Sequence, residues 1–345
     1  METKYWHLTN HQEADEDKII EAVQLLKQGE VVAFPTETVY GLGADATNAI
    51  AVEKIFKAKG RPQDNPLIAH VATKEQLSQL VTEIPKYVER LIEAFSPGPI
   101  TYVLPSNGIC AKNVTAGLST VAVRIPEHPV ANRLLQISGL PIAAPSANTS
   151  GKPSPTTALH VKEDLTGKIA GIIDGGATGV GMESTVVDCT QDYPVILRPG
   201  GITKEQLEQV VDKVLIDPAI RNGTSKELPK SPGMKYKHYS PEVPLLLVEG
   251  DVQAIQDQIN EDKMQTKKVG VLASSRTAEQ LQADEIIALG NNMAEIATNL
   301  YAALRKFKQD EVDIIICEVF PDEGIGAAVM NRLRKAADSM ITKNE

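Results

Sequence analysis

The stretch that decides the fold is residues 34–70, FPTETVYGLGADATNAIAVEKIFKAKGRPQDNPLIAH. It opens at the end of an apolar run, residues 31–34, whose β-branched and aromatic side chains predict a buried strand. Pro35 ends that strand, and Gly41 and Gly43 predict a turn of the backbone soon after it.

A helix and a second strand follow in the same stretch. Residues 45–48 can cap a helix over about residues 49–58, which Gly60 closes. A second apolar run, residues 66–71, predicts another strand and contains His70. Strand, helix and strand in succession are typical of α/β proteins.

Polar side chains gather around these elements. Thr36 and Thr38 are two residues apart, so an extended backbone presents both hydroxyls on one face. Lysines at a helix end usually face solvent, and a histidine in an apolar strand is usually a hydrogen-bonded core residue. However, ligands bind at strand ends of open α/β sheets. The convergence of hydroxyls, cations and a histidine there favours a pocket for a polar, anionic small molecule.

Length and composition indicate a globular protein with two domains. The chain has 345 residues, of which 42% are hydrophobic and 23% charged. No apolar run approaches the roughly 20 residues that a membrane span needs, and the polar, acidic first 18 residues predict neither signal nor transit peptide. Three widely separated cysteines favour a reducing compartment and no zinc site, so we expect a cytoplasmic protein with no membrane contact.

Charge argues for a small anionic ligand. A net charge of −10 disfavours wrapping nucleic acid as a main activity. Residues 51–152 nevertheless carry 11 Lys and Arg against 7 Asp and Glu. A locally positive concavity in an acidic protein suits a nucleotide better than a duplex.

The sequence predicts an α/β fold in two parts. Several strands of the first part are separated only by turns, so we expect an open, twisted, mixed sheet rather than a parallel one. A helix over residues 204–214 is predicted next. From about residue 243, strands and helices alternate regularly, which predicts a small parallel Rossmann-like domain without a GxGxxG loop.

Two loops in the first part could hold phosphate. Residues 144–156, APSANTSGKPSPT, follow a short strand and are rich in hydroxyls and prolines. They do not match a Walker A loop, and composition alone would make them a surface loop. Residues 174–185 are glycine-rich but equally compatible with a hairpin. Arg124 and Arg198 each end an apolar strand. Such an arginine either ends the strand at the protein surface or binds an anion with two hydrogen bonds.

Several motifs in order resemble the YrdC-type threonylcarbamoyl-AMP synthases over about residues 15–200. They are PTETVYGLG at 35–43, KxR at Lys59 to Arg61, NPLxxH at Asn65 to His70, and SxN at Ser146 to Asn148. SPGMKYKHYSP, residues 231–241, resembles the linker of the longer, two-domain members. The resemblance implies a YrdC-like domain over 15–200, a linker or lid over 201–242, and a Rossmann-like domain over 243–345.

The resemblance also implies the reaction and its partners. Such enzymes condense L-threonine, bicarbonate and ATP into threonylcarbamoyl-AMP and release pyrophosphate, the first step of threonylcarbamoyl-adenosine formation in tRNA. Mg²⁺ is expected on the triphosphate, with no metal site of the protein's own. Downstream threonylcarbamoyl-transfer proteins are expected to use the product, and a weak contact with tRNA stays open.

Site residues follow from the same resemblance. The KxR and SxN motifs imply that Lys59, Arg61, Ser146 and Asn148 are catalytic, with Lys59 and Arg61 partly exposed and facing phosphate. L-Threonine would contact Thr38, His70, Arg124, the Ala144 main chain and Ser184, with Arg124 on its carboxylate. ATP would contact Arg61, Asn65, Thr120, Ser146, Ser154, Arg198 and, from the lid, Tyr236.

Two other classes of function remain open at this stage. One is a carbamoyl-adenylate enzyme of another pathway, because the hydrogenase-maturation carbamoyltransferases contain this domain type. Those proteins carry acylphosphatase and zinc-finger modules, which this sequence lacks. The other is an RNA-binding module without catalysis, suggested by the basic region. Pyrophosphate release measured with and without threonine, bicarbonate and RNA would separate the three.

Overall fold

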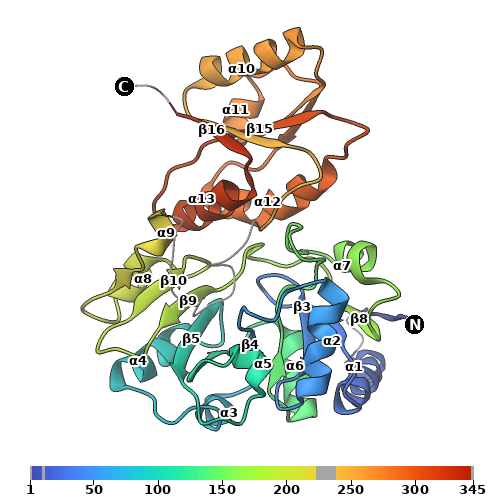
Figure 1. Cartoon of the computed structure of the whole chain (residues 1–345), viewed down its shortest axis with the longest axis vertical. Helices are drawn as coiled ribbons and strands as arrows, with labels where there is room; N and C mark the ends of the chain where they lie inside the picture. The colour runs from blue at the N-terminus through green and yellow to red at the C-terminus, as the bar shows by residue number, and fades with distance from the viewer. Residues whose placement is uncertain (1, 10–11, 223–237, 343–345) are drawn as a thin grey trace. The chain divides into compact units, whose positions relative to one another are not determined.

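The computed structural model describes residues 2–9, 12–222 and 238–342 (Figure 1). The chain forms two compact units. The first is Met1–Ser150 with Ser154–Tyr236, and the second is Gly151–Pro153 with Lys237–Glu345. The second unit therefore includes three residues from the middle of the loop over residues 144–156, which carries the SxN motif and which we call the SxN loop.

The first unit is built on a mixed sheet. Its described residues form 11 strands in the order β1-β8-β2-β3-β7-β4-β6-β5-β9-β10-β11. Five neighbouring pairs are parallel and five are antiparallel, so the predicted mixed sheet is confirmed. The strands are β1 (Lys4–His7), β2 (Val32–Phe34), β3 (Gly41–Asp45), β4 (Ile68–His70), β5 (Ile100–Pro105), β6 (Thr120–Arg124), β7 (Ile142–Ala143), β8 (Gly171–Asp174), β9 (Thr185–Asp188), β10 (Val195–Arg198) and β11 (Leu215–Ile216).

Helices cover both faces of this sheet. They are α1 (Gln12–Lys27), α2 (Ala49–Lys59), α3 (Lys74–Ser78), α4 (Lys86–Phe95), α5 (Lys112–Thr115), α6 (Pro129–Ser138), α7 (Ala158–Leu165), α8 (Lys204–Glu208) and α9 (Ala219–Asn222). The predicted caps of α2 are confirmed: Asn48 accepts from two backbone N–H groups, and Gly60 ends the helix at a φ of 62°. Within the described residues, no helix is long and apolar enough to cross a bilayer.

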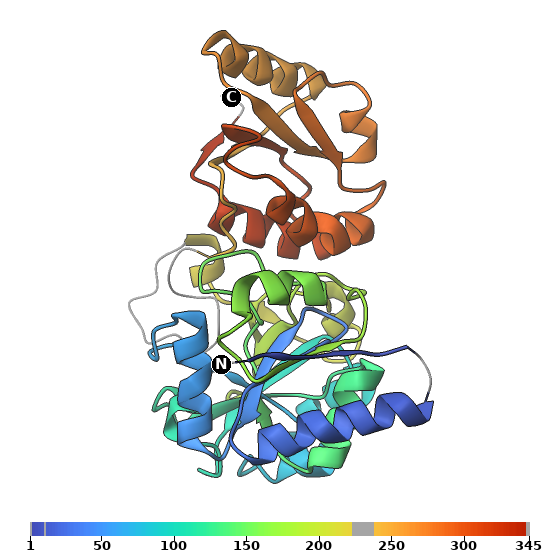
Figure 2. The same cartoon turned by 90° about the vertical axis from the view of Figure 1, so that its right-hand side faces the viewer.

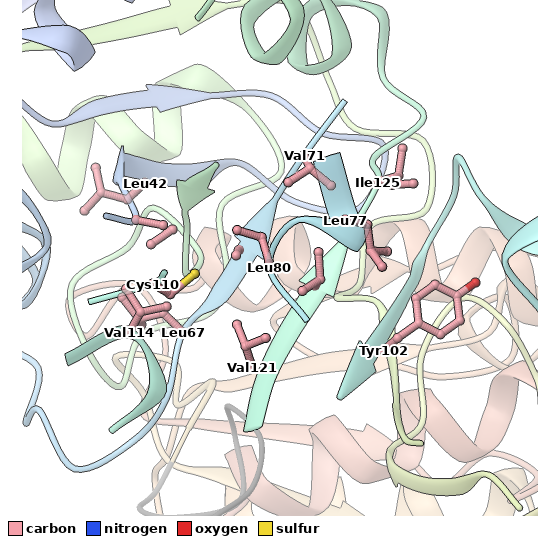
Figure 3. Close-up of a cluster of buried hydrophobic side chains, with 14 of the residues drawn as sticks. Leu42, Leu67, Val71, Leu77, Leu80, Tyr102, Cys110, Val114, Val121 and Ile125 are labelled. Carbon is pink, nitrogen blue, oxygen red and sulfur yellow. The ribbon is translucent and has the colours of Figure 1, made fainter. Parts of the chain in front are cut away.

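Alternation along β2 divides the side chains of this strand between two clusters of the core. Val32 and Phe34 pack in the cluster of α1 and α6, whereas Val31 and Ala33 pack in the cluster of α2, α4 and α7. Figure 3 shows part of the cluster of α2, α4 and α7, with side chains contributed by strands, helices and loops, such as Leu42 of β3, Leu77 of α3 and Leu67 before β4. The two clusters fix the sheet between layers of helices, which holds its strand ends in place.

The predicted turn at Gly41 and Gly43 is wrong, because both residues lie in β3. This strand pairs with β2, and Phe34 of β2 packs over it. A Cβ on Gly43 would lie 2.7 Å from the Phe34 ring and 2.8 Å from Ile142 Cγ2. Glycine is present here to admit those side chains and not to reverse the chain.

The predicted helix over 204–214 is also wrong beyond its first turns. α8 ends at Glu208, although Thr203 and Gln206 form a capping box at its start. Val211 and Val214 are buried in the core instead, and the chain then enters β11, which pairs with β10. Tertiary pairing thus overrides the local helical pattern.

The second unit is the predicted small parallel domain. Its described residues form five strands in the order β14-β13-β15-β12-β16, all paired in parallel. Helix α10 lies on one side of the sheet and α12 and α13 lie on the other, in orange and red in Figures 1 and 2. The elements are β12 (Leu245–Val248), α10 (Val252–Met264), β13 (Val269–Ala273), α11 (Ser275–Ala278), β14 (Glu285–Ala288), α12 (Met293–Lys306), β15 (Ile314–Glu318), α13 (Ile325–Ala336) and β16 (Ser339–Ile341).

Candidate active site

Strand register and hydrogen bonds bring together four of the five residues predicted to bind threonine, all except Ser184. β4 and β6 pair in parallel, with His70 directly beside Arg124 at their carboxyl ends. Arg124 is 4% exposed, and its Nη1 donates to Thr38 Oγ1 at 2.9 Å. The backbone N–H of Ala144 donates to the carbonyl oxygen of Ile68 at 2.9 Å. Thr38, His70, Arg124 and Ala144 therefore form one buried cluster, which we call the Arg124 cluster.

The hydroxyl protons of this cluster can be assigned. Thr36 Oγ1 donates to the carbonyl oxygen of Val39 at 2.7 Å, so its single proton is used. Thr38 must then be the donor in its 2.8 Å contact with Thr36. Thr38 Oγ1 therefore donates to Thr36, accepts from Arg124, and retains capacity to accept one more hydrogen bond.

His70 is a neutral imidazole in this cluster. Burial, together with the nearby charge of Arg124, lowers its pKa to about 3. Its Nδ1 lies 3.2 Å from the carbonyl oxygen of Ile68, which assigns the ring proton to Nδ1. Nε2 is then an acceptor, suited to a hydroxyl or an ammonium group.

The SxN loop pairs with the start of β3. Gly41 and Ser146 form an antiparallel bridge, and the N–H of Ala147 donates to the carbonyl oxygen of Tyr40 at 2.8 Å. The N–H of Tyr40 in turn donates to Pro155 at 2.9 Å. The loop that carries Ser146 and Asn148 is thereby tied to the PTETVYGLG segment.

Lys59 holds this loop from the end of α2. Its Nζ donates to the carbonyl oxygens of Ser146 and Asn148, the latter at 2.6 Å, and lies 3.4 Å from Asn148 Oδ1. Lys59 is 2% exposed, so the expectation that it is partly exposed is wrong. Lys59 is the last residue of α2, and from there its side chain reaches three oxygens of the loop. The structure shows contact with the loop and leaves its role in the reaction as a proposal.

Arg61 and Asn65 form a separate part of the site. Arg61 is half-buried, as expected, and its Nη2 donates to the carbonyl oxygens of Asn65 and Pro66, each at 3.3 Å. Thr120 begins β6, four residues before Arg124. At about 3.3 Å per residue, it lies roughly 13 Å along the strand from the Arg124 cluster.

Ser184 and Arg198 are directly hydrogen-bonded. Arg198 is 5% exposed and donates from Nε and Nη2 to the carbonyl oxygen of Ser184, at 3.1 and 2.9 Å. Its Nη2 also lies 3.2 Å from Ser184 Oγ. Ser154 Oγ donates to Glu183 Oε1 at 2.6 Å. These contacts tie Ser154 and Arg198 to adjacent residues of the glycine-rich 174–185 segment.

Sequence reasoning missed two buried carboxylates. The sequence motifs assign no role to Glu183, and they include Glu37 only as a letter of PTETVYGLG. Glu37 Oε1 lies 2.6 Å from Arg124 Nη2. Strict alternation would turn Glu37 away from Thr38, but the backbone bends at residues 37–39, so both reach Arg124. The PTET motif was the available signal. Tyr236 lies outside the described residues.

The described residues offer no ready metal centre. None of their His, Cys, Asp and Glu side chains form a group of three or more placed to bind a metal ion. Cys110, Cys189 and Cys317 are free and buried. The available groups are cations, hydroxyls, amides, one neutral imidazole and the carboxylates of Glu37 and Glu183, a set that can bind and orient an anionic or zwitterionic substrate.

Two family models match nearly the whole chain. Residues 24–200 match the Sua5_yciO_yrdC family, described as "Telomere recombination". Residues 202–338 match the threonylcarbamoyl-AMP synthase C-terminal domain. Both parts of the resemblance seen in the motifs are thus confirmed.

Full-length relatives agree with the family models. A curated threonylcarbamoyl-AMP synthase of Bacillus subtilis is 50% identical, covering 99% of this chain and 100% of the relative. Another, from Pyrococcus abyssi, is 50% identical over 95% of this chain and 96% of the relative. The crystal structure of P. abyssi Sua5 complexed with L-threonine aligns with a TM-score of 0.92 at 47% identity, over 99% and 100% of the two chains. The chain belongs to the threonylcarbamoyl-AMP synthase family, in its two-domain form.

Proposed function

We propose that this chain condenses L-threonine, bicarbonate and ATP into threonylcarbamoyl-AMP and releases pyrophosphate. The Arg124 cluster is the observation that carries the proposal. A buried guanidinium, a hydroxyl acceptor and a neutral imidazole meet at one strand end, which matches an amino acid that bears a carboxylate and a hydroxyl. The P. abyssi relative bound to L-threonine supports this reading. Neither an RNA-binding module nor an enzyme of another pathway is favoured by the comparisons.

In this proposal, the Arg124 cluster binds threonine. Arg124 takes the substrate carboxylate, since a guanidinium can donate two parallel hydrogen bonds to it. Thr38 and His70 Nε2 accept from the substrate's ammonium or hydroxyl group. The Ala144 main chain and Ser184 line the same site.

ATP would bind along the neighbouring loops. Arg61, Asn65, Thr120, Ser146, Ser154 and Arg198 are the residues proposed for this role. Lys59 donates hydrogen bonds to carbonyl and amide oxygens of the loop, so its first effect is to fix the positions of Ser146 and Asn148. Mg²⁺ would arrive on the triphosphate and screen its charge, because the described residues supply no carboxylate cage.

The chemistry needs positioning more than a protein nucleophile. The threonine nitrogen attacks the carbon of bicarbonate, water leaves, and a carbamate forms. A carbamate oxygen then attacks the α-phosphorus, and the bond to pyrophosphate breaks. Cations and hydroxyls aimed at these groups lower the barrier by orientation and by neutralising charge.

The product restricts the partners. Threonylcarbamoyl-AMP is a mixed anhydride, which water hydrolyses readily, so an acceptor system must follow closely. We propose downstream threonylcarbamoyl-transfer proteins as that system, with at most a weak contact between this chain and tRNA. The three free cysteines fit a reducing compartment, and we propose the cytoplasm.

Pyrophosphate release tests the proposal. The full-length protein with Mg²⁺ and ATP should release pyrophosphate only when both threonine and bicarbonate are present, and added RNA should not be required. Mass spectrometry of the same mixture should show threonylcarbamoyl-AMP. Release without threonine would favour a different carbamoyl-adenylate enzyme, and RNA binding without release would favour the module without catalysis.

A further inference from the structure

Glu37 and Arg124 form a buried ion pair inside the Arg124 cluster. Their side chains are 12% and 5% exposed, and Arg124 Nη2 lies 2.6 Å from Glu37 Oε1. Glu37 is held by its backbone as well, because its carbonyl oxygen accepts from the N–H of Val180 at 2.8 Å. The carboxylate is therefore a fixed component of the cluster.

The contact between the two charges is not an aligned hydrogen bond. Arg124 Nη2 and both carboxylate oxygens of Glu37 are buried and have no hydrogen-bond partner among the described residues. The hydrogen bonds of Arg124 run elsewhere: Nη1 donates to Thr38 Oγ1 at 2.9 Å, and Nε to the carbonyl oxygen of Gly98 at 3.3 Å. Coulombic attraction, rather than a directed bond, joins Glu37 to Arg124.

This arrangement leaves donors available. A guanidinium carries five N–H groups. Two of those of Arg124 are used, by Thr38 and Gly98, and both N–H groups of Nη2 and one of Nη1 are not hydrogen-bonded within the described residues. A carboxylate bound across Nη1 and Nη2 needs one N–H from each. Glu37 thus lies against the guanidinium without an aligned hydrogen bond, and the N–H groups of Nη1 and Nη2 keep capacity to donate to a substrate carboxylate.

The nearby histidines add no positive charge that would compete with Arg124 for Glu37. Burial and the charge of Arg124 lower the pKa of His70 to about 3. Burial also lowers the pKa of His128, and the charge of Glu37 opposes that shift only in part. Removing one partner of a buried ion pair leaves an uncompensated charge, which is strongly unfavourable. Without Glu37, Arg124 would move toward solvent or recruit water.

We propose that Glu37 is a positioning residue for the threonine subsite, which keeps Arg124 inside the site with its Nη donors directed at the substrate carboxylate. This inference rests on the proposed function, since it takes Arg124 as the group that binds threonine. It makes Glu37 act through Arg124 and not by touching the reacting atoms.

Ligand binding to the full-length protein tests the inference. Glu37→Gln keeps the shape and removes the charge, and Glu37→Asp keeps the charge on a shorter stem. Glu127→Gln is the matched control, because Glu127 is exposed and lies three residues after Arg124. Calorimetry should give a threonine Kd about 10-fold or more weaker in Glu37→Gln, an ATP Kd within about twofold of the wild type, and partial recovery in Glu37→Asp. Should Glu37→Gln fail to fold, the Asp variant carries the same comparison.

Each outcome decides the question. Equal weakening of threonine and ATP would show that Glu37 only supports the fold, and would overturn the inference. A tighter threonine Kd in Glu37→Gln would show that Glu37 competes with the substrate carboxylate, and would overturn it too. A wild-type protein that neither binds threonine nor releases pyrophosphate would instead refute the proposed function. An active wild type with an unchanged Glu37→Gln variant would refute this inference alone.

Discussion

The Nζ atom of Lys59 lies 2.6 Å from the carbonyl oxygen of Asn148, so the basic residue of the KxR motif directly holds the SxN loop. Lys59 lies 87 residues before Ser146 and 89 before Asn148 in the chain, yet the two motifs form one unit at the end of α2. A buried ammonium group that donates to oxygens of the loop acts as a fixed support. We therefore expect Lys59 to affect the reaction by holding Ser146 and Asn148 in position.

Lys59→Ala should lower threonine-dependent pyrophosphate release by on the order of 100-fold. The variant leaves carbonyl oxygens of the loop without their donor, so Ser146 and Asn148 lose their fixed positions. Lys57→Ala, at an exposed residue of the same helix, is the control and should be near normal. Circular dichroism should show that both variants are folded. Normal turnover in Lys59→Ala would show that the reaction does not depend on the hydrogen bonds from Lys59 to the SxN loop.

Arg124→Lys should raise the KM for threonine and leave that for ATP nearly unchanged. Lysine keeps the charge but cannot donate two parallel hydrogen bonds, and it cannot reach Thr38 and Gly98 together as Arg124 does. Steady-state pyrophosphate release, with each substrate varied in turn, measures both constants. An unchanged threonine requirement would show that Arg124 does not bind the carboxylate.

Gly43→Ala should destabilise the protein by a few kcal/mol, in the range of overpacked cores. The new methyl group would lie 2.7 Å from the Phe34 ring and 2.8 Å from Ile142 Cγ2, below any normal carbon contact. Gly108→Ala is a useful comparison, since nothing lies within 4 Å of a Cβ there and only its positive φ opposes substitution. Urea unfolding of both variants measures the difference. A Gly43→Ala variant as stable as the wild type would mean that β2 and β3 separate easily.

The sequence could predict those parts of the fold that depend on local chemistry. The α2 helix follows from Asn48 and Gly60, whose capping and left-handed conformations are the ones that their side chains favour. The parallel second sheet follows from regular alternation of strands and helices. β3 could not be found this way, because Gly41 and Gly43 resemble a turn until Phe34 and Ile142 are known to pack against them.

The site was predictable where a motif resembles a known family, and less so where the backbone bends. Thr38, His70 and Arg124 were expected together, and strand register brings them together. The burial of Lys59 was not expected, because a lysine at a helix end normally reaches solvent. The pairing of Glu37 with Arg124 was hidden because the bend at residues 37–39 breaks the alternation used to assign faces.

The buried cysteines should be inert in the folded protein. Burial raises the pKa of Cys110 to about 11, and burial raises the pKa of Cys189 and Cys317 as well. Thiolate is the reactive form, so a disulfide reagent such as Ellman's reagent should label none of them at pH 8 in native protein and all three in urea. Rapid labelling of one thiol in native protein would locate a region that opens.

His70 should make stability depend on pH below neutrality. Its pKa is about 3 in the folded state, where it is buried, and about 6.5 in an unfolded chain. Between those values the unfolded state binds more protons, so the free energy of unfolding falls as pH falls. The contribution is fully present above pH 6.5 and decreases by up to about 1.4 kcal/mol for each pH unit below it.

Urea unfolding from pH 7 to 4 measures this slope, and His70→Gln provides the comparison. Carboxylates also titrate in this range, so the wild-type curve alone is insufficient, but their contribution is common to both proteins. The wild type should lose stability more steeply than His70→Gln as pH falls. In parallel, NMR of the folded protein should show no titration of the His70 ring above pH 4.5. Parallel unfolding slopes, or a ring that titrates near pH 6.5, would mean that His70 is solvated and that the Arg124 cluster is open to water.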